Sequence, residues 1–156
     1  MSGTGSKPDT ASHVHTRPST LPLGPLAWFD GAPAIFADHR LALAVLKALG
    51  KNPGQPIRLN ELAYVTELTA RSGHLVDLGG IEQLINLEVL DLSHNKIADF
   101  SPLAGLSNLT TLMLIGNSIE DISFLSSHAG LERLDLGLNE IKDATPLAPL
   151  TSLTHL

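Results

Sequence analysis

Seven histidines and three evenly spaced aspartates are the residues of this 156-residue chain that could bind a metal. His13 and His15 lie in a polar N-terminal stretch, and the remaining histidines share no common spacing. Asp99, Asp121 and Asp143 recur at one constant interval, which would stack their carboxylates in a column. Oxygen ligands suit Ca²⁺, but one carboxylate per layer is thin coordination, and capping of a helical turn already explains each aspartate. We therefore predict neither a metal nor any other cofactor.

Catalytic motifs are also missing from the sequence. There is no cysteine, no G-x-S-x-G turn, no phosphate-binding glycine loop and no H-E-x-x-H pair. Asp91 and Asp135 are expected on an open sheet, where water is not excluded as acid–base catalysis requires. We predict that the chain is not an enzyme.

The composition limits the class of partner. The net charge is −6 and no basic stripe is present, so binding to nucleic acid or to an anionic membrane is not expected. No apolar run approaches the roughly 20 residues needed for membrane insertion as a spanning helix, and the first residues lack the apolar core of a secretory signal. The compartment stays open, with the cytoplasm favoured because no signal is seen.

An apolar frame, L-x-x-L-x-L-x-x-N-x-I, recurs with a 22-residue period. The three clear copies carry their asparagine at Asn95, Asn117 and Asn139. A degenerate copy starts at Val65, and a truncated copy starts at Leu153. A fixed period of this length predicts a repeat solenoid, in which each unit packs only on its neighbours.

The frame itself predicts the geometry of each unit. The alternation around Leu90 and Leu92 suits a short strand with both leucines pointing inward. The asparagine follows the strand, where its amide can satisfy backbone groups in a buried turn, and stacked copies would form a ladder. Asp99 and Pro102 suit the start of a tight helical turn. Because so short a repeat leaves little room for more, we expect 3-10 turns behind a parallel sheet.

Three regions are predicted: a disordered or extended leader over 1–34, a helical cap over 35–64 and repeats over 65–156. In the cap, Asp38 begins a helix that ends at Gly50, and Asn60 caps a second, short helix.

The stretch 21–36, at the end of the leader, is apolar and interrupted by prolines. It has two open interpretations. We favour an extended lead-in that docks Trp28 and Phe29 on the first helix, and the alternative is a linear motif that binds a partner.

Residues 35–156 resemble leucine-rich repeats of the internalin type. The resemblance rests on the repeat segment I-x-D-F-S-P-L at 97–103, and on the cap sequence from Leu49-Gly50 to Glu67-Leu68. It implies an α/β solenoid: a right-handed array with short parallel strands on the concave side, 3-10 turns on the convex side and an α-helical N-terminal cap. It further implies a protein partner bound on the concave sheet. Relatives of this type are typically exported and end in a C-terminal cap.

The strand residues that alternate with the inward leucines are the predicted protein-binding surface. By register they are Glu67, Thr69, Arg71, Val89, Asp91, Ser93, Thr111, Met113, Ile115, Arg133 and Asp135, with Gly137 completing the last row. Met113, Ile115 and Val89 form an apolar centre within a charged rim, as protein interfaces often show. The alternative is that these are scattered apolar residues without a role.

The sequence therefore predicts a non-catalytic protein–protein interaction module. One alternative is a recognition or regulatory fragment of a larger enzyme, such as a ligase or kinase, because the frame breaks off at Leu156. Another is a structural unit that self-associates through its uncapped C-terminal end.

Overall fold

The structure, a computed structural model, describes residues 32–156. Almost all of the predicted leader, with the expected docking of Trp28 and Phe29, lies outside the described residues. The elements are α1 (His39–Ala48), α2 (Leu59–Leu62), β1 (Glu67–Thr69), η1 (Ile81–Gln83), β2 (Val89–Asp91), η2 (Ser101–Gly105), β3 (Thr111–Met113), η3 (Ser123–Ser127), β4 (Arg133–Asp135) and η4 (Thr145–Leu147). The η elements are 3-10 helices.

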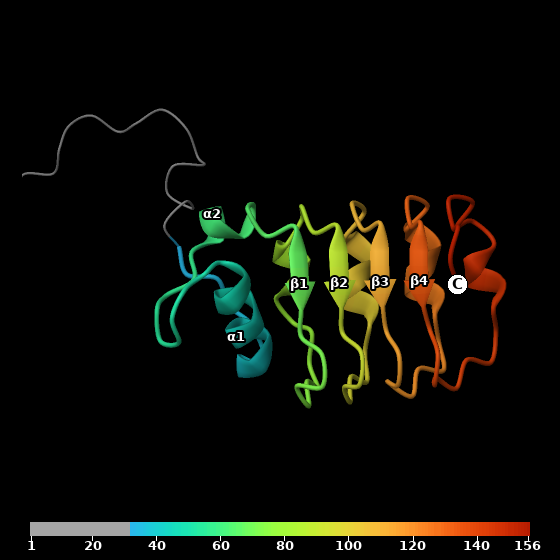
Figure 1. The fold of residues 1–156 in the computed structure, drawn as a ribbon, viewed down its shortest axis with the longest axis horizontal. Coiled ribbons are helices and arrows are strands. Elements are labelled where there is room, and N and C mark those ends of the chain that lie inside the picture. The colour runs from blue at the N-terminus through green and yellow to red at the C-terminus, as the bar shows by residue number, and fades with distance from the viewer. Residues whose placement is uncertain (1–31) are drawn as a thin grey trace, which may run out of the picture.

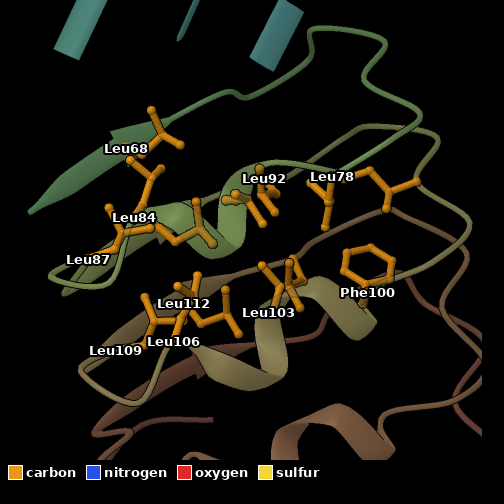
Figure 2. Close-up of a cluster of buried hydrophobic side chains, with 14 of the residues drawn as sticks. Leu68, Leu78, Leu84, Leu87, Leu92, Phe100, Leu103, Leu106, Leu109 and Leu112 are labelled. Atoms are coloured by element: carbon orange, nitrogen blue, oxygen red, sulfur yellow. The ribbon is translucent and has the colours of Figure 1, made fainter. Parts of the chain in front are cut away.

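The strands form one parallel sheet in the order β1-β2-β3-β4, with the 3-10 helices behind it (Figure 1). Their inward leucines are partners in one buried row: Leu68, Leu90, Leu112 and Leu134. Figure 2 shows how leucines from the far side of each coil, such as Leu84 and Leu106, complete the core. Each fully buried leucine contributes about 1.5–3 kcal/mol to stability. The predicted solenoid of parallel strands and 3-10 turns is confirmed.

The asparagine of the first clear repeat satisfies four backbone groups. The Nδ2 group of Asn95 donates to the carbonyls of Ala70 and Leu92, each at 2.8 Å. Its Oδ1 accepts from the N–H groups of Gly73 at 3.1 Å and Leu75 at 3.0 Å. Three of these four groups belong to the preceding coil, so the side chain joins two coils as the sequence predicts.

The ladder is incomplete at its middle position. Asn139 Oδ1 accepts from the N–H groups of Asn117 and Ile119, both at 3.0 Å. Asn117 donates to the carbonyls of Leu92 and Leu114. Its own Oδ1 is buried without a hydrogen-bond partner among the described residues. In the side-chain amide of Asn117, the Nδ2 group therefore makes hydrogen bonds and the oxygen does not.

A second column, which the sequence did not reveal, runs beside the asparagines. The residue preceding each asparagine position has a positive φ between 53° and 66°: Ser72, His94, Gly116 and Leu138. Glycine adopts this left-handed region freely, whereas other residues are strained there. Gly116 is also crowded, because a Cβ atom there would lie 2.8 Å from Nδ1 of His94.

The aspartate column lies just before the 3-10 helices but does not supply the predicted N-caps, because the N-cap residues are Gly80, Phe100, Ile122 and Ala144 and none of them makes a side-chain cap hydrogen bond. Asp77, Asp99, Asp121 and Asp143 each accept a 2.8 Å hydrogen bond from the backbone N–H two residues later. The backbone N–H and hydroxyl of Ser101 hold the pKa of Asp99 below its usual value. The hydroxyl and N–H of Thr145 lower the pKa of Asp143 in the same way.

Helix α1 shields the first repeat and is tied to it by its N-cap residue. One oxygen of Asp38 accepts from the N–H of Arg40 at 2.9 Å, and the other accepts from the N–H of Val76 at 3.2 Å. The helix buries Leu41 and Val45 on the side that packs against β1. Asp38 thus caps the helix and holds it to the repeats.

The second helix and the start of the cap differ from the sequence prediction. Helix α2 begins at Leu59, so Asn60 lies inside it, and Arg58 stands at the N-cap. The N–H of Arg58 donates to Oε2 of Glu61 at 2.8 Å, which replaces the predicted asparagine cap. The N–H of Ala34 donates to the carbonyl of Ile57 at 2.8 Å, so the described part of the cap starts before residue 35.

Candidate functional site

The sheet face turned away from the leucine core, which we call the concave face, carries the predicted site. The register aligns one row across the four strands: Glu67, Val89, Thr111 and Arg133. A second row lies beside it: Thr69, Asp91, Met113 and Asp135. Residues far apart in sequence are therefore brought together in the order that the repeat period predicts.

The predicted apolar centre is partly open to solvent. Val89, Met113 and Ile115 are all half-buried, whereas Leu112 and Leu114, which alternate with them, are fully buried. The strand alternation has therefore turned apolar side chains to the outside of the sheet. Apolar side chains on a solvated sheet face weaken solubility, so their presence favours a surface that a partner covers.

Two predicted contact residues are withdrawn from the surface, which corrects the sequence analysis. Ser93 is fully buried and Asp91 is only 7% exposed. One oxygen of Asp91 accepts from the N–H of Ser93 at 2.9 Å, and the other lies 3.9 Å from a guanidinium nitrogen of Arg71. The carboxylate therefore accepts a hydrogen bond from the backbone just after β2 and lies near the side chain of Arg71.

The opposite side of the centre is a hollow that the sequence analysis missed. A cavity of about 360 Å³ is lined by Met113, Arg133, Asp135, His155 and Leu156, with Leu134 at its base. His155 continues the row of Arg133 through an isolated parallel bridge. Because His155 follows Arg133 by one full repeat, the period would have found it had the truncated copy been included in the face.

The remaining predicted surface residues lie at the edges of the face. Glu67 and Thr69 are exposed beside α1, and Thr111 is half-buried between Val89 and Arg133. Asp135 is half-buried, and its Oδ1 accepts from the N–H of Gly137 at 3.0 Å. The face thus has an apolar centre with charged groups on both sides.

Other residue types with chemical potential have structural roles. Among residues 32–156, no group of three or more histidine and acidic side chains is placed to hold a metal ion. His128 is buried, with Nε2 at 3.0 Å from the carbonyl oxygen of Leu103 and Nδ1 at 3.1 Å from that of Phe124. The ring therefore bridges two neighbouring coils. In the same described range, no helix has the length and apolar character needed to cross a bilayer.

Comparison with known proteins gives the same kind of architecture. Residues 85–127 match the family model described as leucine-rich repeats in two copies. The human leucine-rich repeat-containing protein 56 is 37% identical over 92 residues, which are 58% of this chain and 17% of that protein.

Two solved structures from Listeria monocytogenes are similar over 78% of the chain. The internalin inlF has 38% identity and a TM-score of 0.74, with 37% of its chain covered. The internalin C2, inlC2, has 32% identity and a TM-score of 0.60, with 64% covered. The chain therefore spans less than two-thirds of the length of each of these relatives. In its period, cap and fold, the chain has the architecture of leucine-rich repeats and is similar to the internalins.

Proposed function

We propose that this chain is a non-catalytic module that binds a protein partner on its concave face. The observation that carries the proposal is the half-buried apolar centre of Val89, Met113 and Ile115, which lies on a sheet face with exposed residues at its edges. A partner would cover these side chains and meet the charged groups around them, as in interfaces with an apolar core and a polar rim. The repeat fold of the relatives supports an interaction role, because solenoids present extended binding surfaces.

The charged groups on the two sides of the centre would set the orientation of the partner. Arg71 is held by Asp91 on one side, while Arg133 and Asp135 line the hollow on the other. Rim charges of this kind act mainly on association rate and specificity. Glu67, Thr69 and Thr111 complete the proposed contact area, and Ser93 is left out because it is buried.

The test is a double substitution of the apolar centre. The partner is first isolated with the intact chain. Met113→Ser with Ile115→Ser should then raise the dissociation constant for that partner at least tenfold, about 1.4 kcal/mol, because central apolar contacts dominate binding energy. The matched control is Val76→Ser with Ile85→Ser, which removes two exposed apolar side chains elsewhere, 52% and 61% exposed. Dissociation constants from biolayer interferometry should be unchanged in the control. Equal binding by the Met113/Ile115 variant would exclude the concave face.

A second candidate is self-association through the last coil. Its inward residues Leu136, Ile141 and Leu147 are only partly buried, and Leu156 is 78% exposed. Sedimentation velocity over a dilution series would detect dimers as a concentration-dependent coefficient. A role as the recognition part of a larger enzyme is a third candidate, supported by the greater length of the relatives, and a catalytic domain encoded beside these repeats would establish it.

A further inference from the structure

Neighbouring coils are joined by a repeated set of hydrogen bonds at the edge where the strands end, the lower edge in Figure 1. Between the coil of β1 and the coil of Asn95, the N–H groups of Gly73 and Leu75 donate to Oδ1 of Asn95. The N–H of Lys96 donates back to the carbonyl of Leu75 at 3.0 Å. The coils of Asn117 and Asn139 are joined by the same set, in which the N–H donors are Asn117, Ile119 and Glu140.

This set is missing between the coils of Asn95 and Asn117, a junction that we call the central seam. By the repeat period, Asn95 and Ile97 should donate to Oδ1 of Asn117, and Ser118 should donate to the carbonyl of Ile97. Within residues 32–156, however, the N–H groups of Asn95, Ile97 and Ser118 have no hydrogen-bond partner, and neither has Oδ1 of Asn117. A cavity of about 400 Å³ opens at the same place, between residues 97–101 and residues 118–121.

The two coils stay joined on both sides of this gap. On the strand side, the N–H of His94 donates to the carbonyl of Ile115 at 2.6 Å. On the side of the 3-10 helices, the rings of Phe100 and Phe124 stack across the seam with their centroids 5.5 Å apart. The gap is therefore confined to the turn after β3, and the coils are not separated as whole units.

The backbone of this turn accounts for one of the missing bonds. Ser118 has φ 57°, whereas φ is not positive at the equivalent residues Lys96 and Glu140, whose N–H groups donate to the preceding coil. His74, the equivalent residue in the coil of β1, is also left-handed, and no repeat precedes it. A serine is strained in this region. Ser118 therefore bears strain and also lacks the hydrogen bond that its equivalents make.

We propose that the peptide unit between Asn117 and Ser118 is a switch with two positions, of which this structure shows the open one. Rotation of the unit gives Ser118 a negative φ and turns its N–H toward the carbonyl of Ile97, as in the neighbouring coils. The corner then closes, and Oδ1 of Asn117 accepts from the N–H groups of Asn95 and Ile97. The closed position gains these hydrogen bonds and loses the strain of Ser118.

The aromatic pair acts against closure. Phe124 occupies the repeat position that holds the smaller Pro102 and Pro146 in the flanking coils. Its ring stacks on Phe100 of the preceding coil, next to the open corner, and both rings line the cavity. Packing of the two rings therefore opposes the hydrogen bonds of the closed position, so neither position is favoured by every contact.

The switch lies beside the proposed contact surface, since Ile115 directly precedes the turn at Gly116. A partner that holds Ile115 would therefore bias the switch, because a ligand shifts a two-state equilibrium by its different affinity for the two states. This coupling rests on the proposed function. The switch itself is tested without a partner, so its failure and the failure of concave-face binding are distinguishable.

Substitutions at the exposed Ser118 test the switch by shifting its balance. Ser118→Gly removes the strain of the left-handed form and should favour the open position. Ser118→Val makes that form less favourable and should favour the closed one. Native-state hydrogen exchange followed by NMR should then show the amides of Asn95 and Ile97 exchanging about fivefold or more slowly in Ser118→Val than in Ser118→Gly. Ser118→Thr, which is also β-branched, should change the exchange in the same direction as Ser118→Val.

The matched control is the equivalent exposed position in the next coil, where φ is not positive. Glu140→Gly and Glu140→Val should give the same protection at Asn95 and Ile97. Two results would overturn the proposal. Equal protection of these amides in the Ser118 variants would mean that the turn does not switch. Protection in the intact chain as high as that of the equivalent amides, Leu75 and Ile119, would mean that the seam is closed and that the open position is not populated.

Discussion

At the residue scale, the asparagine ladder makes unequal contributions that the repeat sequence hides. Asn95 satisfies two N–H groups and two carbonyls, whereas Asn117 leaves its own oxygen unpaired. We predict that Asn95→Ala destabilises the protein by roughly 3 kcal/mol, because it removes the partner of four backbone groups, two in buried and two in part-buried hydrogen bonds. Asn117→Ala should cost clearly less, since only carbonyls lose a donor. Urea unfolding of both variants checks the order, and equal losses would contradict it.

The left-handed column gives a second prediction at this scale. Leu138 has φ 55° and is 79% exposed, so it bears backbone strain with little packing in return. Leu138→Gly should raise the free energy of unfolding by about 0.5–1 kcal/mol. The substitution removes the backbone strain of the folded state, and this gain is partly offset because glycine increases the entropy of the unfolded chain. Gly116→Ala should instead lower it by about 2 kcal/mol, because its Cβ would meet His94. Thermal melts of both measure this, with Gly105→Ala as the control.

Residue identity explains why the sequence predicted one column and missed the other. The asparagines repeat as a type, and an amide has an obvious use where a buried strand ends. The left-handed positions hold serine, histidine, glycine and leucine, so no residue type marks them. Burial of Ser93 was missed for a similar reason: alternation gives the direction of a side chain but not how far its neighbours cover it.

At the scale of elements, the cap helix should respond to acid through one carboxyl. Burial raises the pKa of Asp38, but the N–H groups of Arg40 and Val76 and the charge of Arg40 outweigh it, and the net pKa is lowered from 3.8. A lowered pKa in the folded state means that the carboxylate adds stability above its unfolded pKa. That stability is lost as pH falls through the folded value.

Asp38→Asn tests this linkage. Near neutral pH the variant should be less stable by about 1–2 kcal/mol, because an amide caps α1 but cannot accept from Val76 as well. The difference between the two proteins should shrink as the pH falls below 3.8. Glu61, Asp99 and Asp143 also have lowered pKa values, but they are present in both proteins and cancel. Urea melts from pH 6 to pH 3 measure the difference, and a constant gap would contradict the assignment.

The boundaries of the elements were predicted where a cap residue has a clear signature. Asp38 begins α1 as expected. Asp99 instead stands one residue before the N-cap residue Phe100 of η2 and accepts from the N–H of Ser101. The start of α2 was wrong, because Glu61 reaches back to the N–H of Arg58 and takes the place of a capping side chain at Asn60. A carboxylate three residues inside a helix is a weaker signal than a polar residue before it.

At the scale of the whole molecule, the repeat period predicted the fold and the rows of the concave face, because stacking in one register follows from the period. It could not predict which face residues are accessible. That property depends on the lengths of neighbouring side chains, such as Arg71 beside Asp91, and on how the last coil ends. The apolar centre at Met113 and Ile115 was predictable because it breaks the polar pattern of a solvated face.

In a protein that consists of these 156 residues, the array should open from its last coil. Inward leucines in or just after the strands donate their N–H groups to the next coil: Leu92 to Met113 at 2.9 Å, Leu114 to Asp135 at 2.8 Å, and Leu134 to His155 at 3.0 Å. These hydrogen bonds are nearly equal in length. Differences in the hydrogen-exchange protection of the three amides therefore reflect the stability of the coils and not the strength of the individual bonds. Leu136, Ile141 and Leu147 of the last coil are only partly buried, although Leu150 is buried, whereas their counterparts in the two preceding coils are buried.

Stability in a repeat array is the sum of unit and nearest-neighbour terms, so a coil with one neighbour and an exposed core opens at the lowest free energy. Native-state hydrogen exchange should therefore show protection that falls in the order Leu92, Leu114, Leu134. A partner that packs on the last coil would raise the protection of Leu134 above that of the isolated chain. A partner confined to the apolar centre would protect Leu114 more strongly. Equal protection at all three amides would mean that the chain unfolds as one cooperative unit, and the nearest-neighbour description would then fail.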